Sequence, residues 1–300
     1  MSWQAFGDWG TSNLRLYRME AGAVVARADG PGIGKLEGTP AQALRAALGQ
    51  LAGGTEPSRI TLCGMAGSRT GLIEAPYALC PAGVDDWAQA AVVAQFDGVP
   101  LRIGAGLACE DASGRPDVMR GEEAQIFGAM ALDPQRAKGQ AIYVLPGTHA
   151  KWAEVTQGRI TGFRTFMTGE LFDLLRRHST LLTPGDDGTQ ADEDAGFAQG
   201  LSRGLQGDGL AASLFATRAQ QLRQGWLRRQ SIGFLSGLCL GDEVAAMRRL
   251  RGLPAEVTLI GAGPLCGRYA QSLAACGVGA VQMDGEACVL QGMEWLDGER

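Results

Sequence analysis

Short apolar runs separated by turn-forming residues fill the first part of the chain and predict strands. Three of these runs predict an antiparallel meander at about 3–8, 13–18 and 23–28. The patterns that follow alternate between helical and strand spacing, and they predict a helix near 40–51, a strand at 59–64, a helix near 86–95 and a strand at 101–104. The first half therefore has the predicted order βββαβαβ.

The same order recurs after a predicted helix at 121–132. Its elements are predicted strands near 142–145, 151–155 and 159–165, a helix from about 169 to 180, a strand at 256–260, a helix near 265–276 and a strand near 279–283. A long helical stretch that covers much of 192–250 interrupts this second set. The repeated order indicates that the chain contains two units of one kind.

Two units of this kind, each a mixed sheet covered by helices, predict an α/β protein with two lobes and a ligand-binding cleft between them. We place the lobes at 1–118 and 119–284, the second with a helical insertion. The C-terminal helix, about 285–300, is expected to pack back on the first lobe.

Composition excludes several functional classes. Among 300 residues, 45% are apolar and 20% are charged, which is typical of a packed globular protein. The net charge of −5 lacks the positive field that nucleic acid requires, so we expect no nucleic-acid partner. Seven cysteines without CxxC spacing indicate free thiols in a reducing compartment. Neither a signal-peptide pattern nor a long apolar run is present, so we expect a cytoplasmic protein with no membrane partner.

The turn after the first predicted strand has the residue types that bind phosphate. Asp8 ends the strand, and Gly10, Thr11 and Ser12 follow it. Backbone N–H groups and the two hydroxyls can donate to phosphate oxygens, and the Asp8 carboxylate can hold Mg²⁺ directly or through water. The alternative is an ordinary hairpin with an Asx-type turn.

A second glycine and hydroxyl turn, Gly147-Thr148, occupies the equivalent place in the second unit. Two such turns that face each other across a cleft could bind both ends of a triphosphate. A third segment, Gly261-Ala262-Gly263, ends a buried strand in small residues, so an adenosine could approach its backbone.

Two other nucleotide motifs fit less well. A Rossmann interpretation of the third segment would use Asp284, but the third glycine comes one residue late and Pro264 removes a backbone donor. A Walker A interpretation of 30–36 fails, because Asp29 and Leu36 replace the glycine and the hydroxyl that it requires, and a surface turn is predicted there.

Two acids, Glu122 and Glu123, open the helix predicted at 121–132. They could simply oppose the helix dipole. Alternatively, one carboxylate could orient or deprotonate a hydroxyl that attacks the γ-phosphate of a nucleotide. Elsewhere, Thr168 is predicted to be a helix N-cap, and His178 is predicted to be structural.

At these positions the sequence resembles the 2-dehydro-3-deoxygalactonokinases, a bacterial family of the sugar kinase, Hsp70 and actin superfamily. The similar segments follow one another over nearly the whole chain: DWGTSNLR at 8–15, GMAGS at 64–68, APY at 75–77, MRGEEAQIFGA at 119–129, PGTHAKW at 146–152, FRTFMTGELF at 163–172 and FLSGLCLGDEVA at 234–245. The resemblance implies two RNase H-like lobes with an interlobe nucleotide cleft, which is the actin-like ATPase fold.

The resemblance also implies a reaction and roles for residues. The reaction is transfer of the γ-phosphate of ATP, with Mg²⁺, to the 6-hydroxyl of 2-dehydro-3-deoxy-D-galactonate in galactonate catabolism. Related phosphatases have their catalytic glutamate in a GxEE segment, so Glu122 or Glu123 is the candidate base. The other implied roles are metal binding by Asp8, phosphate contacts by Thr11, Ser12, Asn13, Gly147 and Thr148, and nucleoside contacts by Gly261, Ala262 and Gly263.

A sugar acid requires a cation for its carboxylate. Arg120, Arg164 and Lys151 are the candidates, because arginine in particular can bind a carboxylate through two hydrogen bonds. His149 and Glu170 complete the predicted substrate contacts. Two other functions remain open at this point: an ATPase or exopolyphosphatase-type phosphohydrolase of the same fold, and a nucleotide-gated binding protein without a small-molecule acceptor.

Overall fold

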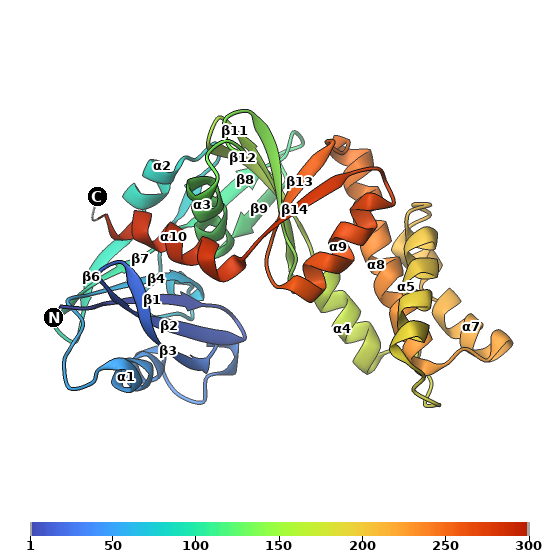
Figure 1. Cartoon of the computed structure of the whole chain (residues 1–300), viewed down its shortest axis with the longest axis horizontal. Helices are drawn as coiled ribbons and strands as arrows, with labels where there is room; N and C mark the ends of the chain where they lie inside the picture. The colour runs from blue at the N-terminus through green and yellow to red at the C-terminus, as the bar shows by residue number, and fades with distance from the viewer. Residues whose placement is uncertain (1, 299–300) are drawn as a thin grey trace. The chain divides into compact units, whose positions relative to one another are not determined.

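The computed structural model describes residues 2–298, whose elements are drawn in Figure 1. The chain forms two compact units. The first consists of Met1–Tyr143, Trp152–Arg164 and Met283–Arg300, and the second consists of Val144–Lys151 and Thr165–Gln282. The lobes at 1–118 and 119–284 were predicted from the repeated order of strands and helices. Division into compact units uses a different criterion and does not test them, so the lobes stay a prediction.

A six-stranded sheet of order β3-β2-β1-β4-β7-β6 forms the centre of the first unit. Its strands are β1 (Gln4–Trp9), β2 (Asn13–Glu20), β3 (Ala23–Pro31), β4 (Arg59–Gly64), β6 (Val92–Phe96) and β7 (Val99–Ile103). β1 pairs antiparallel with β2 and parallel with β4. Helix α1 (Pro40–Leu51) begins with Thr39 and Gln42 in a capping box, and it buries Leu44, Ala47 and Leu51. The predicted meander and the elements at 40–51 and 59–64 are therefore present.

Three hairpin turns have the same backbone geometry. Ala21-Gly22, Asp97-Gly98 and Gln157-Gly158 all have positive φ at both positions, the pattern of a type I′ turn. This turn matches the twist of the flanking strands, so it fixes the register of each hairpin. Glycine at the second position relieves the strain of a positive φ.

The helix predicted near 86–95 is wrong over its second half. Helix α2 (Val84–Gln89) ends early, and β6 follows as the antiparallel partner of β7. Between Val92 and Phe96 the side chains alternate between more and less exposed positions, which is a strand period. A further sheet of three short strands, β5 (Tyr77–Leu79), β8 (Gly106–Glu110) and β9 (Pro116–Met119), was not predicted.

Helices α3 (Glu122–Leu132) and α10 (Gly285–Asp297) pack at close range within the first unit. A Cβ atom on Gly128 would lie 1.8 Å from the carbonyl oxygen of Cys288, so only glycine permits this approach. The end of α10 is attached to the sheet, because the Asp297 carboxylate accepts a hydrogen bond of 2.7 Å from Thr61.

A second sheet has the order β12-β11-β10-β13-β14. Its strands are β10 (Gln140–Leu145), β11 (Ala150–Thr156), β12 (Arg159–Phe166), β13 (Glu256–Ile260) and β14 (Gly279–Met283), with helices α4 (Thr168–His178) and α9 (Gly263–Ala274) between them in sequence. Apart from the helical insertion, the predicted βββαβαβ order is present in this half.

The helical insertion consists of α5 (Gln190–Gly204), α6 (Leu210–Ser213), α7 (Ala216–Gln224) and α8 (Arg228–Arg251). α5 and α8 lie against each other through glycines (Figure 1): a Cβ atom on Gly200 would lie 2.0 Å from the carbonyl oxygen of Phe234, and one on Gly237 would lie 2.1 Å from that of Phe197. Among the helices of residues 2–298, none is long and apolar enough to cross a membrane.

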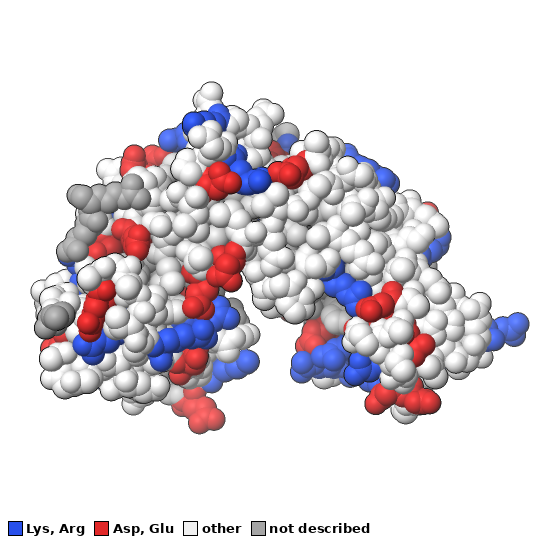
Figure 2. Space-filling view, in the orientation of Figure 1, with Lys and Arg blue, Asp and Glu red and all other residues white. Residues whose placement is uncertain are grey.

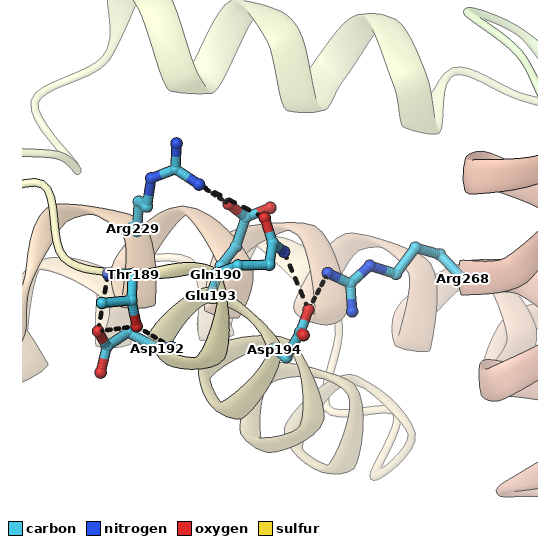
Figure 3. Close-up of polar contacts among 7 residues, drawn as sticks. All are labelled: Thr189, Gln190, Asp192, Glu193, Asp194, Arg229 and Arg268. Atoms are coloured by element: carbon cyan, nitrogen blue, oxygen red, sulfur yellow. Dashed lines mark hydrogen bonds and ion pairs between the residues drawn. The ribbon is translucent and has the colours of Figure 1, made fainter.

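Polar contacts fix the start of α5 (Figure 3). Thr189 and Asp192 form a capping box, Glu193 pairs with Arg229, and Asp194 pairs with Arg268 of α9 at 2.6 Å. On the face drawn in Figure 2, acidic and basic side chains are interspersed, without the broad basic patch of a nucleic-acid-binding surface.

Candidate active site

Asp8 lies at the end of β1, between β2 and β4. In register it is opposite Arg15 on β2 and Cys63 on β4. Its carboxylate is 3.7 Å from the Arg15 guanidinium and accepts a long contact of 4.0 Å from the Cys63 thiol. Burial raises the pKa of Asp8 and the charge of Arg15 opposes this shift, while 19% of its side chain stays exposed. The carboxylate is thus only loosely paired, near the C-terminal end of this central strand.

The turn that follows Asp8 is supported by the segment 32–34. Gly10 donates its N–H to the carbonyl of Asn13 at 2.8 Å, and Thr11 accepts from Gly34 at 3.0 Å. A Cβ atom on Gly32 would lie 2.4 Å from this backbone, so the glycine permits the close approach. Thr11, Ser12 and Asn13 are exposed on the turn. Residues 32–34, which belong to the segment that fails as a Walker A motif, therefore support the predicted phosphate turn through backbone contacts.

Glu122 and Glu123 are both held at the start of α3. Glu122 accepts from the N–H of Arg120 at 3.0 Å, and both oxygens of Glu123 accept from the N–H of Gly121 at 2.8 Å. Glu123 is fully buried, whereas Glu122 is partly exposed. Burial, and then the charge of Glu122, raise the pKa of Glu123 to about 8. Both carboxylates therefore fix the backbone that leads into α3.

Asp8 contacts Cys63, and the charges of all three acids act on its thiol. Burial raises the pKa of the Cys63 thiol, and the charges of Asp8, Glu123 and Glu122 raise it further. Gly121, with a φ of 109°, passes close to Gly64, because a Cβ atom there would lie 3.1 Å from the Gly64 Cα. The first unit thus brings together all three acids that the sequence singled out. Cys63 was missed, although the parallel pairing of its strand with β1 places it beside Asp8.

Arg120 and Arg164 have different partners. The Arg164 guanidinium pairs with Asp111 at 2.8 Å, and Arg115 pairs with the same carboxylate. Arg120 donates to the carbonyl of Ala75 at 2.9 Å and lies 4.3 Å above the ring of Tyr77. Its Nε and Nη1 atoms are buried without hydrogen-bond partners. Among the described residues, Arg120 forms no ion pair.

In the second unit, the turn Gly147-Thr148 lies against the start of α4. Thr148 accepts from the N–H of Glu170 at 2.9 Å, and a Cβ atom on Gly169 would lie 2.3 Å from the carbonyl oxygen of Gly147. The Glu170 carboxylate is 2.5 Å from Nε2 of His149, and both side chains are exposed. The predicted contacts Thr148, His149 and Glu170 therefore form one cluster.

Lys151 follows this cluster on β11. Its side chain is buried, and its ammonium group donates to the Thr165 hydroxyl at 2.8 Å. Of the substrate candidates in this unit, Lys151 is thus buried, whereas His149 and Glu170 are exposed.

The segment Gly261-Ala262-Gly263 lies beside the same turn. Gly261 has a φ of 151°, and a Cβ atom on it would lie 3.9 Å from the carbonyl oxygen of Pro146 and 3.4 Å from the Cys266 sulfur. The predicted phosphate and nucleoside turns of the second unit are therefore neighbours. Asp284, on which the Rossmann interpretation depended, is the N-cap of α10 and accepts from Ala287.

The prediction that Thr168 is an N-cap is wrong. Met167 occupies the cap position of α4, and the Thr168 hydroxyl donates instead to the Glu243 carboxylate on α8. Sequence reasoning missed this contact because 75 positions separate the two residues. His178 is exposed at the end of α4, with nothing that indicates a ligand role.

The residues present are suited to Mg²⁺ only in combination with other oxygen ligands. Within 2–298, no three side chains of His, Cys, Asp or Glu converge as a metal site. Mg²⁺ usually binds one or two carboxylates and completes its shell with water and substrate phosphates. The loosely paired carboxylate of Asp8 fits that requirement.

Comparisons with known proteins agree on one family. The model of the 2-keto-3-deoxy-galactonokinases matches residues 8–296. The protein named "Probable 2-dehydro-3-deoxygalactonokinase DgoK1" of Rhizobium meliloti is 37% identical over 292 residues, and the 2-dehydro-3-deoxygalactonokinase of Escherichia coli is 34% identical over 291 residues. Each alignment covers 95% of this chain and 94% of the relative.

Solved structures support the fold. A crystal structure from Sinorhizobium meliloti superposes with a TM-score of 0.86 at 34% identity, covering 98% of this chain and 97% of that one. The activator of the 2-hydroxyisocaproyl-CoA dehydratase from Clostridium difficile, with bound ADPNP, gives a TM-score of 0.52 at 11% identity and covers 98% of this chain and 94% of the other. The predicted α/β fold of the sugar kinase and actin-like ATPase type is confirmed.

Proposed function

The chain belongs to the 2-keto-3-deoxy-galactonokinase family, and on that premise we propose that it transfers the γ-phosphate of ATP to the 6-hydroxyl of 2-dehydro-3-deoxy-D-galactonate, a step of galactonate catabolism. The resemblance seen in the sequence is thereby confirmed at the level of family. The observation in the structure that carries the proposal is that Asp8 contacts Cys63 at the end of β4, while the start of α3, which bears Glu122 and Glu123, lies against the next residue, Gly64.

Glu122 is the better candidate for the base that orients or deprotonates the sugar hydroxyl. A base must come within hydrogen-bond reach of the proton that it takes, and Glu122 is partly exposed whereas Glu123 is fully buried. The bond from the Arg120 N–H fixes the Glu122 carboxylate at the start of α3. Glu123 instead accepts a hydrogen bond from the Gly121 N–H and so fixes the turn before α3.

Asp8 would hold Mg²⁺ in this proposal. When bound, Mg²⁺ supplies positive charge that neutralises the β- and γ-phosphates during transfer. Among the described residues, the contacts of the Asp8 carboxylate with Arg15 and Cys63 are long, so its oxygens can take a hard cation without loss of a strong ion pair.

The second unit has predicted nucleotide contacts of its own. Gly147 and Thr148 would donate to the phosphates, and Gly261, Ala262 and Gly263 would allow the nucleoside close to the backbone. The adjacency of these two turns supports a single nucleotide that spans both. In the first unit, Thr11, Ser12 and Asn13 stay predicted phosphate contacts.

Arg120 is the favoured cation for the substrate carboxylate. Two of its nitrogen atoms, Nε and Nη1, are buried without a hydrogen-bond partner, and a bound carboxylate would supply one. Arg164 is already neutralised by Asp111, and Lys151 is buried against Thr165. In the second unit, His149 and Glu170 stay predicted substrate contacts.

One coupled assay tests the proposal against the phosphohydrolase alternative. ADP release should depend on added 2-dehydro-3-deoxy-D-galactonate, and the product should carry a 6-phosphate. Phosphate release without an acceptor would support the hydrolase instead, and nucleotide binding without either product would support a binding protein. A parallel assay with the gluconate-derived epimer determines whether the enzyme distinguishes the two sugar acids.

A further inference from the structure

A buried carboxylate joins three helices of the second unit. Glu243 on α8 is only 2% exposed. Its two oxygens accept from the Tyr269 hydroxyl of α9 at 3.0 and 3.1 Å, and one of them also accepts from the Thr168 hydroxyl of α4. A buried carboxylate is tolerated only when hydrogen bonds compensate the loss of water, so this arrangement fixes α4, α8 and α9 to one another.

Thr168, the first partner of Glu243, is adjacent in sequence to residues that contact the predicted phosphate turn. Thr168 is the first residue of α4, and Gly169 follows it against the carbonyl of Gly147. Glu170, one residue further, donates its N–H to Thr148. The position of the Gly147-Thr148 turn therefore depends on the start of α4.

Tyr269, the second partner, lies on the helix that follows the predicted nucleoside turn. Tyr269 lies on α9, which begins at Gly263, immediately after Gly261 and Ala262. The Cys266 sulfur, one turn before Tyr269 on the buried face of this helix, lies beside Gly261. The position of α9 thus determines where this turn stands relative to Pro146.

We infer that Glu243 is a positioning residue for the nucleotide, which holds the phosphate turn and the nucleoside turn at the spacing that ATP requires. The inference rests on the proposed function in that it takes ATP as the ligand of both turns. A carboxylate suits this role because it offers acceptor oxygens only, and both hydroxyls donate to it.

The test removes one hydroxyl at a time. Thr168→Val and Tyr269→Phe keep the shape of each side chain and delete its donor, and Thr168→Ser restores the donor. The matched control is Ser272→Ala: Ser272 is also buried on α9, but its hydroxyl bonds to the Arg268 carbonyl within the same helix. Thermal unfolding establishes that each variant is folded at the assay temperature.

The readout is the dissociation constant of the fluorescent nucleotide mant-ATP, together with KM for ATP, KM for the sugar acid, and kcat. Thr168→Val and Tyr269→Phe should each weaken mant-ATP binding by about tenfold, the scale of one hydrogen bond to a charged group, and should raise KM for ATP in parallel. KM for the sugar acid should change little. The double variant should lose less than the product of the two effects, because both act through one carboxylate.

Two results would overturn the inference. Folded variants that bind mant-ATP as tightly as the unchanged chain would show that Glu243 is only structural, and a loss of affinity in Ser272→Ala equal to theirs would show the same. In both cases sugar-acid phosphorylation by the unchanged chain leaves the proposed function intact. If the unchanged chain neither binds mant-ATP nor phosphorylates the sugar acid, the proposed function fails and the inference fails with it.

Discussion

The turn after β1 and the turn after β10 occupy equivalent places in two sheets, but they carry different ionisable groups. The strand orders β3-β2-β1-β4 and β12-β11-β10-β13 repeat each other. Near the end of β1 lie three acids: Asp8, and Glu122 and Glu123 at the start of α3, which passes close to Gly64. The turn after β10 has instead the Thr148 hydroxyl and the exposed pair of His149 and Glu170.

This difference shows how one scaffold can serve two purposes. Backbone N–H groups, hydroxyls and glycines suffice to receive a polyphosphate, and both halves have them. Carboxylates can bind a metal and transfer a proton, and the three that the sequence singled out for these tasks, Asp8, Glu122 and Glu123, belong to the first unit. We therefore expect substitutions in the first unit to affect kcat, and substitutions around the second turn to affect nucleotide affinity.

The largest effect is expected at Asp8. Asp8→Asn keeps the size of the side chain and removes its charge, so kcat should fall roughly 10²-fold or more, the scale of one lost electrostatic contact in a transition state. The coupled ADP assay at saturating substrates measures it. Asp29→Asn, which alters an exposed ion pair with Arg27 on the same sheet, is the control and should be near neutral. An unchanged kcat in Asp8→Asn would contradict the proposal that Asp8 binds the metal ion.

The next effect separates the two glutamates. Glu122→Gln should lower kcat by roughly 10²-fold, because a general base contributes at least that much. Glu123→Gln should keep most of the activity, since its amide oxygen can still accept from the Gly121 N–H. Equal and mild losses in both variants would indicate that these acids only cap α3.

Glu123 should also make stability depend on pH. Its pKa is about 8 in the folded chain against 4.5 for the free side chain. Between these values the folded state retains a proton that the unfolded state has lost, so stability falls as pH rises through this window. Glu123→Gln cannot titrate and should lose less stability between pH 5 and pH 8. Urea midpoints at both pH values measure this, with the exposed Glu37→Gln as control; an identical fall in Glu123→Gln and the unchanged chain would refute the assignment.

The regular elements could be predicted because their signals are local. Turn residues such as Ala21-Gly22 and Gln157-Gly158 separate apolar runs, so the two meanders were predicted correctly. Most of the run from Val92 to Phe96 was assigned to a helix because a short apolar segment fits the spacing of a helix as well as that of a strand. Its pairing with β7 makes it a strand.

The candidate site could be predicted by residue type but not by contact. Asp8, Glu122 and Glu123 stood out as acids beside glycines, whereas Cys63 gained significance only through the register of β1 and β4. The role of Thr168 depended on Glu243, a partner from a distant helix. A capping motif has a local signature, and a hydrogen bond between distant helices has none.

The smallest effect concerns the helical insertion, which belongs to the second half alone. A Cβ atom on Gly200 would lie 2.0 Å from the carbonyl oxygen of Phe234, so Gly200→Ala should force α5 and α8 apart and cost about 1–3 kcal/mol of unfolding free energy. Gly267→Ala on α9 is the matched control, because a Cβ atom there meets nothing within 4 Å; it should stabilise the chain by about 0.5–1 kcal/mol. Urea unfolding measures both changes. Since α8 also carries Glu243, Gly200→Ala should weaken ATP binding more than it lowers kcat at saturating ATP, and the opposite order would contradict the division of roles between the two turns.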